Sequence, residues 1–203
     1  MPPIARTAAR PIRLLALPVA LTLTLGGCGV NTIPTKEEAA KAAWAQVENQ
    51  YQRRADLIPN LVATVQGEAK QEKDVLVGVT QARASASAIH LSDDDLKDPA
   101  KVAAYEQAQN HVSSALTALR PLQEAYPDLK SNTAFMSLQS QLEGTENRIT
   151  IARQDYNTAV QDYNTTIRTF PALIGAKVIY GSKPLVPFKA TTVNAQVAPT
   201  VKF

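Results

Sequence analysis

The sequence predicts an all-α protein, an elongated antiparallel bundle of three to four long helices that is similar to a four-helix up-and-down bundle. Three observations predict this class. Ala, Leu, Gln and Glu are abundant and Gly and Pro are sparse between residues 36 and 170, which favours helix. Apolar residues in this stretch recur every three or four positions, as they do on one face of a helix. The alternation typical of a β-strand is absent from the sequence before residue 171.

Residues 1–27 have the features of a lipoprotein signal peptide. Three arginines and no acidic residue precede the apolar run at 14–25. A run of 12 residues is too short to span a membrane, which takes about 20, and it fits a secretory signal. The Leu-Gly-Gly-Cys sequence at 25–28 resembles the bacterial lipobox, in which cleavage after Gly27 leaves Cys28 as a lipidated N-terminus. We therefore expect Cys28, the single cysteine of the chain, to be a lipid anchor.

The mature chain predicted from this cleavage has no net charge. The whole chain has 21 Lys+Arg and 18 Asp+Glu, and the leader holds three of the arginines, which leaves 18 of each sign. The charge thus gives no indication of a nucleic-acid partner. Gly29, rather than Asp, follows the cysteine, and this favours the periplasmic side of the outer membrane, with the inner membrane as the alternative. We expect a lipid-anchored protein of the bacterial cell envelope.

Residues 28–35 are predicted to form a lipidated tether, followed by a helical domain at 36–188. Thr35 and Glu38 have the spacing of a capping box at the start of the first helix. Pro59 lies inside its apolar pattern, but the pattern continues in phase and leaves no residues for a reversing loop. We predict a continuous helix that is kinked near Pro59. The predicted buried series contains Trp44, Val47, Tyr51, Ala55, Ile58, Val62, Val65, Ala69, Leu76, Val79 and Ala86.

A second helix is predicted to begin with Asp98 as N-cap and Pro99 at its first position. The Tyr-Pro-Asp sequence at 126–128 is a predicted connection, and a third helix covers about 131–170. The buried face of the second helix is predicted to hold Val102, Tyr105, Val112, Leu116, Leu119 and Leu122, and that of the third Phe135, Leu138, Leu142, Thr145, Ile149, Ala152, Tyr156, Val160, Tyr163, Ile167 and Phe170.

The residues after Pro171 are predicted to differ from the bundle. Residues 178–180 and 185–188 are expected to pack back onto the helices as extended segments, and 189–203 to form a flexible C-terminal tail. Three glycines interrupt the helical patterns, either because the surface tolerates them or because helices approach closely there: Gly67, Gly78 and Gly144.

Four stretches in order resemble the signatures of the LemA family. They are QRRADLIPNLV at 52–62, EAYPDLK at 124–130, LEGTENRI at 142–149 and the stretch from Tyr163-Asn164 to Phe170-Pro171. The resemblance covers residues 40–188 and implies a helical bundle that is anchored at its N-terminus to a bacterial membrane. It implies no catalytic residue, substrate or cofactor. Many members have an uncleaved N-terminal membrane helix, whereas this sequence has the signal for a lipid.

The candidate site consists of two polar clusters and of further residues from the motifs. One cluster surrounds Pro59, and the other occupies one turn of the last predicted helix. Glu143 and Glu146 suit acid–base hydrolysis if one pKa is raised. The alternative, which we favour, is that acids and arginines pair between helices and fix their register, while Asn60 satisfies backbone groups freed by Pro59. The candidate residues are Arg53, Arg54, Asp56, Pro59, Asn60, Tyr126, Pro127, Glu143, Glu146, Asn147, Arg148, Tyr156, Tyr163 and Asn164.

The Asp-Tyr-Asn sequence occurs twice, at 155–157 and 162–164, one heptad apart. We expect both tyrosines to bury their rings and present their hydroxyls to a facing helix, which we favour over a ligand site. His90 and His111 lack partners at metal-ligand spacing, and the acidic run at 92–95 lacks the glycine and final Glu of a calcium loop. We therefore predict no metal, no cofactor and no small-molecule substrate.

The favoured function is a non-enzymatic, lipid-anchored helical scaffold of the cell envelope, of the LemA type, that acts through protein partners or self-association. The alternative is a membrane-remodelling or membrane-sensing coiled coil, which requires a second exposed apolar or basic face. A hydrolase that uses Glu143 and Glu146 is the third hypothesis.

Overall fold

The computed structural model describes residues 31–69 and 71–189, which form helices and connecting segments without a strand. The prediction of an all-α fold is confirmed. Residues 1–27, with the predicted signal peptide, and Cys28 lie outside the described residues, as does the predicted tail after Lys189. The elements are α2 (Thr32–Glu68), α3 (Lys73–Ser87), the 3-10 turn η1 (Asp95–Lys97), α4 (Pro99–Thr117), α5 (Arg120–Ala125), α6 (Pro127–Ser131), α7 (Thr133–Thr166), α8 (Ala172–Gly175) and the π-helical turn η2 (Ala176–Tyr180).

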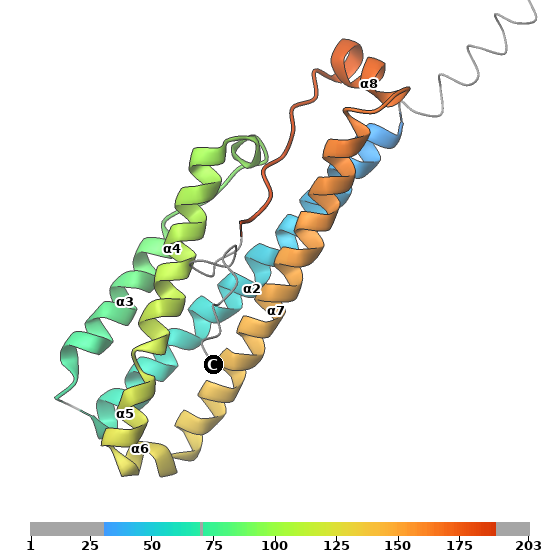
Figure 1. The fold of residues 1–203 in the computed structure, drawn as a ribbon. Helices are drawn as coiled ribbons and strands as arrows, with labels where there is room; N and C mark the ends of the chain where they lie inside the picture. Colours follow the sequence, from blue (N-terminus) through green and yellow to red (C-terminus); the bar gives the residue numbers. More distant parts are fainter. Residues whose placement is uncertain (1–30, 70, 190–203) are drawn as a thin grey trace, which may run out of the picture.

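The two longest helices, α2 and α7, lie side by side and form the spine of the molecule (Figure 1). They run in opposite directions: the Lys36 Nζ donates to Asp162 over 2.9 Å near one end, and the Asn132 amide donates to Glu68 over 3.4 Å at the other. Helix α3 packs against α2, and α4 packs against α3, whereas α4 and α7 have little or no close backbone contact. The backbones of α4 and α7 therefore stand apart, and we call this the open side of the molecule.

Polar caps fix the starts of α4 and α7. The Asp98 carboxylate accepts from the Ala100 N–H over 2.8 Å, as predicted. The Asn132 amide oxygen accepts from the N–H groups of Ala134 and Phe135 over 3.0 and 3.1 Å, a cap that was not predicted. Each cap satisfies backbone donors that the first helical turn leaves unpaired.

The predicted capping box is wrong. Helix α2 already begins at Thr32, so Thr35 lies within the first helical turns rather than at the N-cap. The Thr35 hydroxyl donates to the carbonyl of Asn31 over 2.9 Å. Pro34 is compatible with this earlier start because the first helical turn has no acceptor for its missing N–H.

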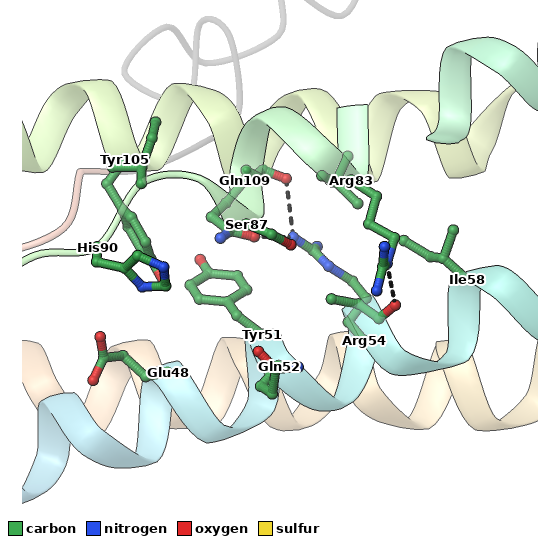
Figure 2. A pocket seen from close by; sticks show the side chains of 14 residues that line it. Glu48, Tyr51, Gln52, Arg54, Ile58, Arg83, Ser87, His90, Tyr105 and Gln109 are labelled. Carbon is green, nitrogen blue, oxygen red and sulfur yellow. Dashed lines mark hydrogen bonds between the residues drawn. The ribbon is translucent and has the colours of Figure 1, made fainter. Parts of the chain in front are cut away.

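Helix α2 passes through Pro59 without interruption, as predicted. Proline has no N–H to donate to the carbonyl of Ala55, four residues earlier. The Arg83 Nε of α3 donates to this carbonyl over 2.7 Å instead (Figure 2). The prediction that Asn60 satisfies the freed backbone is wrong, because Asn60 is exposed and Arg83 occupies the carbonyl.

From Trp44 onward, the buried stripe of α2 differs from the predicted one at two positions. Ala55 and Val62 are only half-buried, because Arg54 and Leu61 hold the buried positions. On α7 the predicted stripe is buried except for Leu138, which is half-buried, and beyond the helix end Phe170 is 79% exposed. The stripe of α2 contains Ile33, Ala40, Trp44, Val47, Tyr51, Arg54, Ile58, Leu61 and Val65, with alternating steps of three and four from Trp44 onward.

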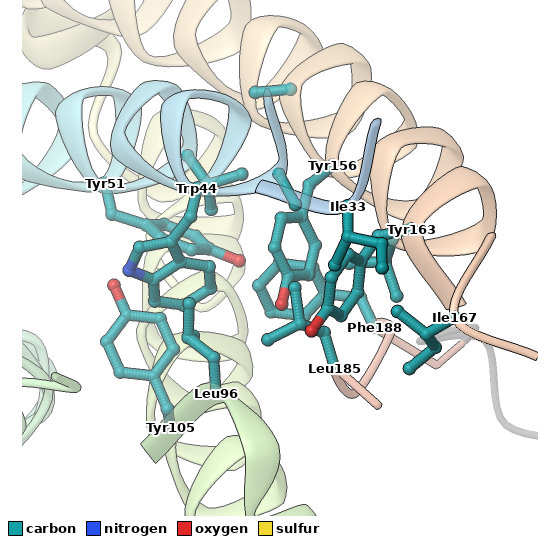
Figure 3. Close-up of a cluster of buried hydrophobic side chains, with 14 of the residues drawn as sticks. Ile33, Trp44, Tyr51, Leu96, Tyr105, Tyr156, Tyr163, Ile167, Leu185 and Phe188 are labelled. Carbon is teal, nitrogen blue, oxygen red and sulfur yellow. The ribbon is translucent and has the colours of Figure 1, made fainter. Parts of the chain in front are cut away.

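Two apolar clusters lie along the molecule, and a polar layer separates them. The upper cluster, toward the α8 end, is rich in aromatic rings around Trp44 (Figure 3). The lower cluster, toward α5 and α6, is mainly aliphatic and contains Ile58, Leu76, Leu129 and Leu142. The layer between them contains the buried side chains of Arg54, Gln109 and Thr145.

Candidate functional site

A groove lies on the open side of the molecule, between α4 and α7. Its lower part has a cavity volume of about 360 Å³ and its upper part about 290 Å³, and both parts include Ser113 and Glu146. We call the two parts together the α4–α7 groove. Its lower part is lined by Leu61, Ser113, Leu116, Thr117, Leu119, Arg120, Gln123, Phe135, Gln139, Leu142, Glu143 and Glu146. Apolar side chains thus share this part of the groove with amides, hydroxyls and charged groups.

Arg54 connects three helices at the centre of this groove, and it is only 1% exposed. One guanidinium nitrogen donates to the Ser113 hydroxyl and to the Glu146 carboxylate, each over 2.7 Å. The other donates to Gln109, over 3.1 Å to its carbonyl and 2.6 Å to its side-chain oxygen. A buried cation is costly unless it is paired and hydrogen-bonded, and Arg54 meets both conditions. The predicted pairing between helices is therefore present at Arg54 and Glu146.

A second buried ion pair lies at the upper end of the groove. The Arg153 guanidinium donates to Glu106 over 2.7 Å and to the Lys189 carbonyl over 2.9 Å. The Lys189 N–H donates to the same oxygen of Glu106 over 3.0 Å. Burial raises the pKa of Glu106, and the charge of Arg153 opposes this shift. The pair thus ties α4, α7 and the end of the described chain together.

Residues 181–189, which we call the C-terminal strap, lie in extended conformation between α7 and η1 (Figure 1). The Asn164 amide donates to the Leu185 carbonyl over 2.8 Å and accepts from the Leu185 N–H over 2.9 Å. Asn157 makes the same pair of bonds with Phe188, over 3.1 and 2.8 Å. Each asparagine therefore satisfies one backbone donor and one backbone acceptor of the strap.

The tyrosines of the repeated Asp-Tyr-Asn sequence also bind the strap. The Tyr156 hydroxyl donates to the Val186 carbonyl over 3.1 Å, and the Tyr163 hydroxyl donates to the Lys183 carbonyl over 3.2 Å. Both rings are buried, as predicted, but their hydroxyls reach the strap and not a facing helix. The predicted return of residues 185–188 onto the bundle agrees with the structure, whereas 178–180 form a helical turn with exposed side chains.

A smaller pocket lies on the other side of Arg54, between α2, α3 and α4 (Figure 2). Tyr51 lies beside Arg54, whose guanidinium carbon is 5.0 Å from the centre of the Tyr51 ring. Burial raises the pKa of Tyr51 and that of Glu48. A volume of about 80 Å³ is enough for a few water molecules and too small for an organic substrate.

The structure divides the candidate residues from the sequence into four groups, and one of these, described above, binds the strap: Tyr156, Tyr163 and Asn164. Arg54, Glu143 and Glu146 line the α4–α7 groove. Tyr126 and Pro127 lie at the lower end, where the Tyr126 hydroxyl donates to Glu72 over 3.0 Å and Pro127 begins α6. The fourth group is exposed and does not line the groove: Arg53, Asp56, Pro59, Asn60, Asn147 and Arg148.

Gln109, which is buried beside Arg54, is not among the residues predicted from the sequence. The sequence contains a signal for the burial of both Gln109 and Arg54. Gln109 fills the gap of seven between Tyr105 and Val112 in the predicted stripe of α4, and Arg54 continues the steps of three and four on α2. A polar residue at the same kind of position on two helices predicts a polar layer.

Within residues 31–69 and 71–189, no group of three His, Cys, Asp or Glu side chains has the geometry of a metal site. Over the same residues, none of the helices combines the length and apolar character that a membrane span requires.

A comparison with models of protein families matches residues 43–203 to the LemA family. The chain belongs to the LemA family. The match includes α2 from Ala43 onward, α7 and the strap, so it covers both the groove and the residues that bind the strap. No curated protein matches the LemA chain.

Proposed function

We propose that this LemA protein is a non-enzymatic, lipid-anchored helical scaffold of the cell envelope that binds an extended segment of a partner protein in the α4–α7 groove. The observation that carries the proposal is the open side between α4 and α7, with its cavity volumes of about 360 and 290 Å³. The bundle that surrounds the groove supplies a rigid platform, and the groove supplies the specific contacts.

The strap indicates what kind of ligand suits this side of the molecule. It is an extended peptide, and side-chain amides of α7 bind its backbone immediately above the groove. The lower groove has similar groups: the amides of Gln123 and Gln139 bond to each other across it, between α5 and α7. A bound peptide backbone can replace such an amide–amide bond, while Leu116, Phe135 and Leu142 provide apolar contact for its side chains.

The same geometry disfavours hydrolysis by Glu143 and Glu146. The Glu146 carboxylate accepts a charge-assisted bond from Arg54, so this oxygen is occupied. Glu143 accepts from the Gln139 amide over 3.1 Å and is exposed. Both carboxylates then act as partners that hold side chains in place, and we assign them to the rim of a binding groove.

The lipid anchor is proposed from the lipobox at 25–28, and the outer membrane, on its periplasmic side, from Gly29, with the inner membrane as the alternative. The substitution Cys28→Ser tests the anchor, because the serine oxygen does not form the thioether that lipidation requires. We expect a larger precursor that takes up no labelled fatty acid, while a Ser137→Ala control is processed normally. Normal processing and labelling of Cys28→Ser would contradict the anchor.

The groove is tested with the full-length chain in native envelopes. A photo-crosslinking residue at Thr117, in the lower groove, is compared with one at Ala104 on another face of α4. The crosslinked segment is identified by mass spectrometry, synthesised and titrated against the protein. We expect Thr117→Trp, which fills the groove, to weaken binding by about tenfold or more, and Ala104→Trp to leave it unchanged. Equal binding to both variants would contradict a partner site in the groove.

A further inference from the structure

The segment from Phe170 to Tyr180, which contains α8 and η2 and which we call the apolar tip, has most of its large apolar side chains on the outside. Among the described residues, eight large apolar side chains are exposed to solvent, and five of them lie between 170 and 180. The inner face of this segment is made of small residues, since Ala172 and Ala176 are 7% and 2% exposed. The exposed residues are Phe170 (79%), Ile174 (58%), Val178 (78%), Ile179 (63%) and Tyr180 (44%). This arrangement is the reverse of a helix that packs its apolar face on a core and faces water with polar groups.

This apolar tip lies at the end of the molecule where the described chain begins. Helix α8 contacts α2, and Ile33, at the start of α2, belongs to the same buried cluster as Ala172 and Ala176 (Figure 1). Cys28 is three residues before Asn31, a distance of at most about 11 Å for an extended chain. If Cys28 carries the anchor, the apolar tip is the end of the rod that lies nearest the bilayer.

The two basic residues in and beside the tip favour an anionic surface. Asp162 is the last acidic residue of the chain, and it is paired with Lys36. Arg168 and Lys177 follow it and are exposed. The charge of Lys183 acts on Asp94, and the acidic residues of this end, Glu37 and Glu38, belong to the start of α2. Basic side chains around an apolar surface are the pattern of elements that lie in the headgroup region of a membrane with anionic lipids.

We propose that the apolar tip inserts into the membrane interface, with Phe170, Ile174 and Val178 among the acyl chains and Arg168 and Lys177 at the lipid phosphates. This inference rests on the proposed lipid anchor, which brings the tip to the surface. The backbone of the tip suits this location, because its turns are closed by their own hydrogen bonds and Gly181, with φ of 57°, ends them. The tip also supplies the second apolar and basic face that a membrane-sensing function requires. Two contacts would then hold the rod, the acyl chains on Cys28 and this surface, and would fix its orientation on the membrane.

The test uses two labelled forms of the full-length lipoprotein, Val178→Cys at the tip and Val77→Cys on α3. Both positions are exposed, at 78% and 51%, so a label at either leaves the core intact. An environment-sensitive fluorophore is attached to each, and the parent chain, whose single cysteine is Cys28, gives the background. The proteins are reconstituted in phosphatidylcholine–phosphatidylglycerol vesicles with and without brominated acyl chains, which quench fluorophores inside the bilayer. Flotation of the vesicles measures the anchor separately.

We expect both variants to float and bromolipid to quench the label at 178 by about twofold or more, with no quenching at 77. Adding Arg168→Glu and Lys177→Glu to Val178→Cys is expected to reduce quenching in vesicles that contain phosphatidylglycerol and to leave it unchanged in phosphatidylcholine alone. Flotation of both variants with equal, weak quenching would overturn insertion of the tip and leave the anchor intact. Loss of flotation by both would overturn the anchor and, with it, this inference.

Discussion

At the scale of single residues, Arg54 determines how the helices fit together. It occupies a position of the α2 stripe whose other members are apolar, and it bonds to α4 and α7. A buried ion pair is a weak source of net stability, because desolvation offsets the attraction. Its value lies in register: Arg54 meets its partners only when Gln109 and Glu146 are level with it along the bundle.

Replacing Arg54 by Met therefore tests the polar layer. We expect a loss of about 2–4 kcal/mol in unfolding free energy, since the Gln109 carbonyl and side chain lose their donor while the half-exposed Glu146 can be solvated. Arg53→Met, one residue earlier but exposed, is the matched control, and its change is expected to stay within about 0.5 kcal/mol. Urea denaturation measures both. An equal loss of unfolding free energy in Arg54→Met and Arg53→Met would mean that Arg54 contributes only as a surface charge.

The buried tyrosines give a pH dependence. Burial raises the pKa of Tyr51, Tyr105, Tyr156 and Tyr163, so their phenols stay protonated in the folded chain, whereas in the unfolded chain they ionise near pH 10. The unfolded state then binds fewer protons above this pH. The contribution to stability is fully present below about pH 10 and is lost as the pH rises through the folded pKa values.

We therefore expect the phenolate absorbance of these tyrosines to appear together with the loss of helical circular dichroism at alkaline pH. Tyr156→Phe, which keeps the ring and removes the ionisable hydroxyl, is expected to weaken the dependence of stability on pH above pH 10. A smooth titration of all six tyrosines in the folded protein would contradict this assignment.

At the scale of elements, the repeated Asp-Tyr-Asn sequence has the same spacing along α7 as the strap residues that it binds. Asn157 and Asn164 are one heptad apart and rise about 10.5 Å along α7. Their partners, Phe188 and Leu185, are three residues apart in an extended chain and span about 10 Å. The repeat therefore matches the strap, which runs antiparallel to the helix, and the two tyrosines add bonds at the same spacing.

The contact between Arg83 and Ala55 shows how α2 tolerates a proline in its interior. Arg83→Met is expected to cost about 1–3 kcal/mol, because the Ala55 carbonyl then lacks a donor. In the background of Pro59→Ala, which restores an N–H four residues after Ala55, the same change is expected to cost clearly less. A double-mutant cycle of thermal or urea unfolding measures this coupling. Identical costs in both backgrounds would show that Arg83 acts independently of the proline.

The regular helices were predictable from the sequence, because caps and periodicity are local. Asp98 gave the start of α4, and the heptads of α7 gave its buried face. The reversal between Glu68 and Lys73 was harder to detect, since the apolar spacing from Ala69 to Leu76 continues in phase across it. The groove and the strap depend on contacts between residues far apart in the sequence, which periodicity within one helix does not contain.

The candidate site was predicted in part for the same reason. Pairing of arginines with acids between helices was predicted for both polar clusters from their charges, and it is present at Arg54 and Glu146. Arg54 was left out of the buried stripe because that stripe was built from apolar residues alone, which shifted it to Ala55. The role of Asn164 was recognised only as part of a motif, because an asparagine that binds an extended segment has no pattern of its own in the sequence.

At the scale of the whole molecule, the core is divided. The upper cluster is built around Trp44, whose indole lies 5.4 Å from the rings of Tyr105 and Tyr156 and 5.6 Å from that of Phe188 (Figure 3). The lower cluster is mainly aliphatic and borders the α4–α7 groove through Leu61, Leu119, Phe135 and Leu142. Between them, the Arg54 layer contributes hydrogen bonds rather than apolar packing. The two halves share only the continuous helices α2, α4 and α7.

This division predicts that a cavity in one half loosens that half first, because local opening follows the units that share a packed core. Leu129→Ala in the lower cluster and Leu96→Ala in the upper cluster are matched changes at sites 0% and 1% exposed, and each is expected to cost about 2–5 kcal/mol. In hydrogen exchange with mass spectrometry, Leu129→Ala is expected to speed exchange mainly in α3, α5 and α6. Leu96→Ala is expected to do so mainly in the strap, whose Val186 N–H donates to the Leu96 carbonyl over 2.9 Å. Faster exchange throughout the chain in both variants would show instead that the polar layer joins the two clusters into one cooperative unit.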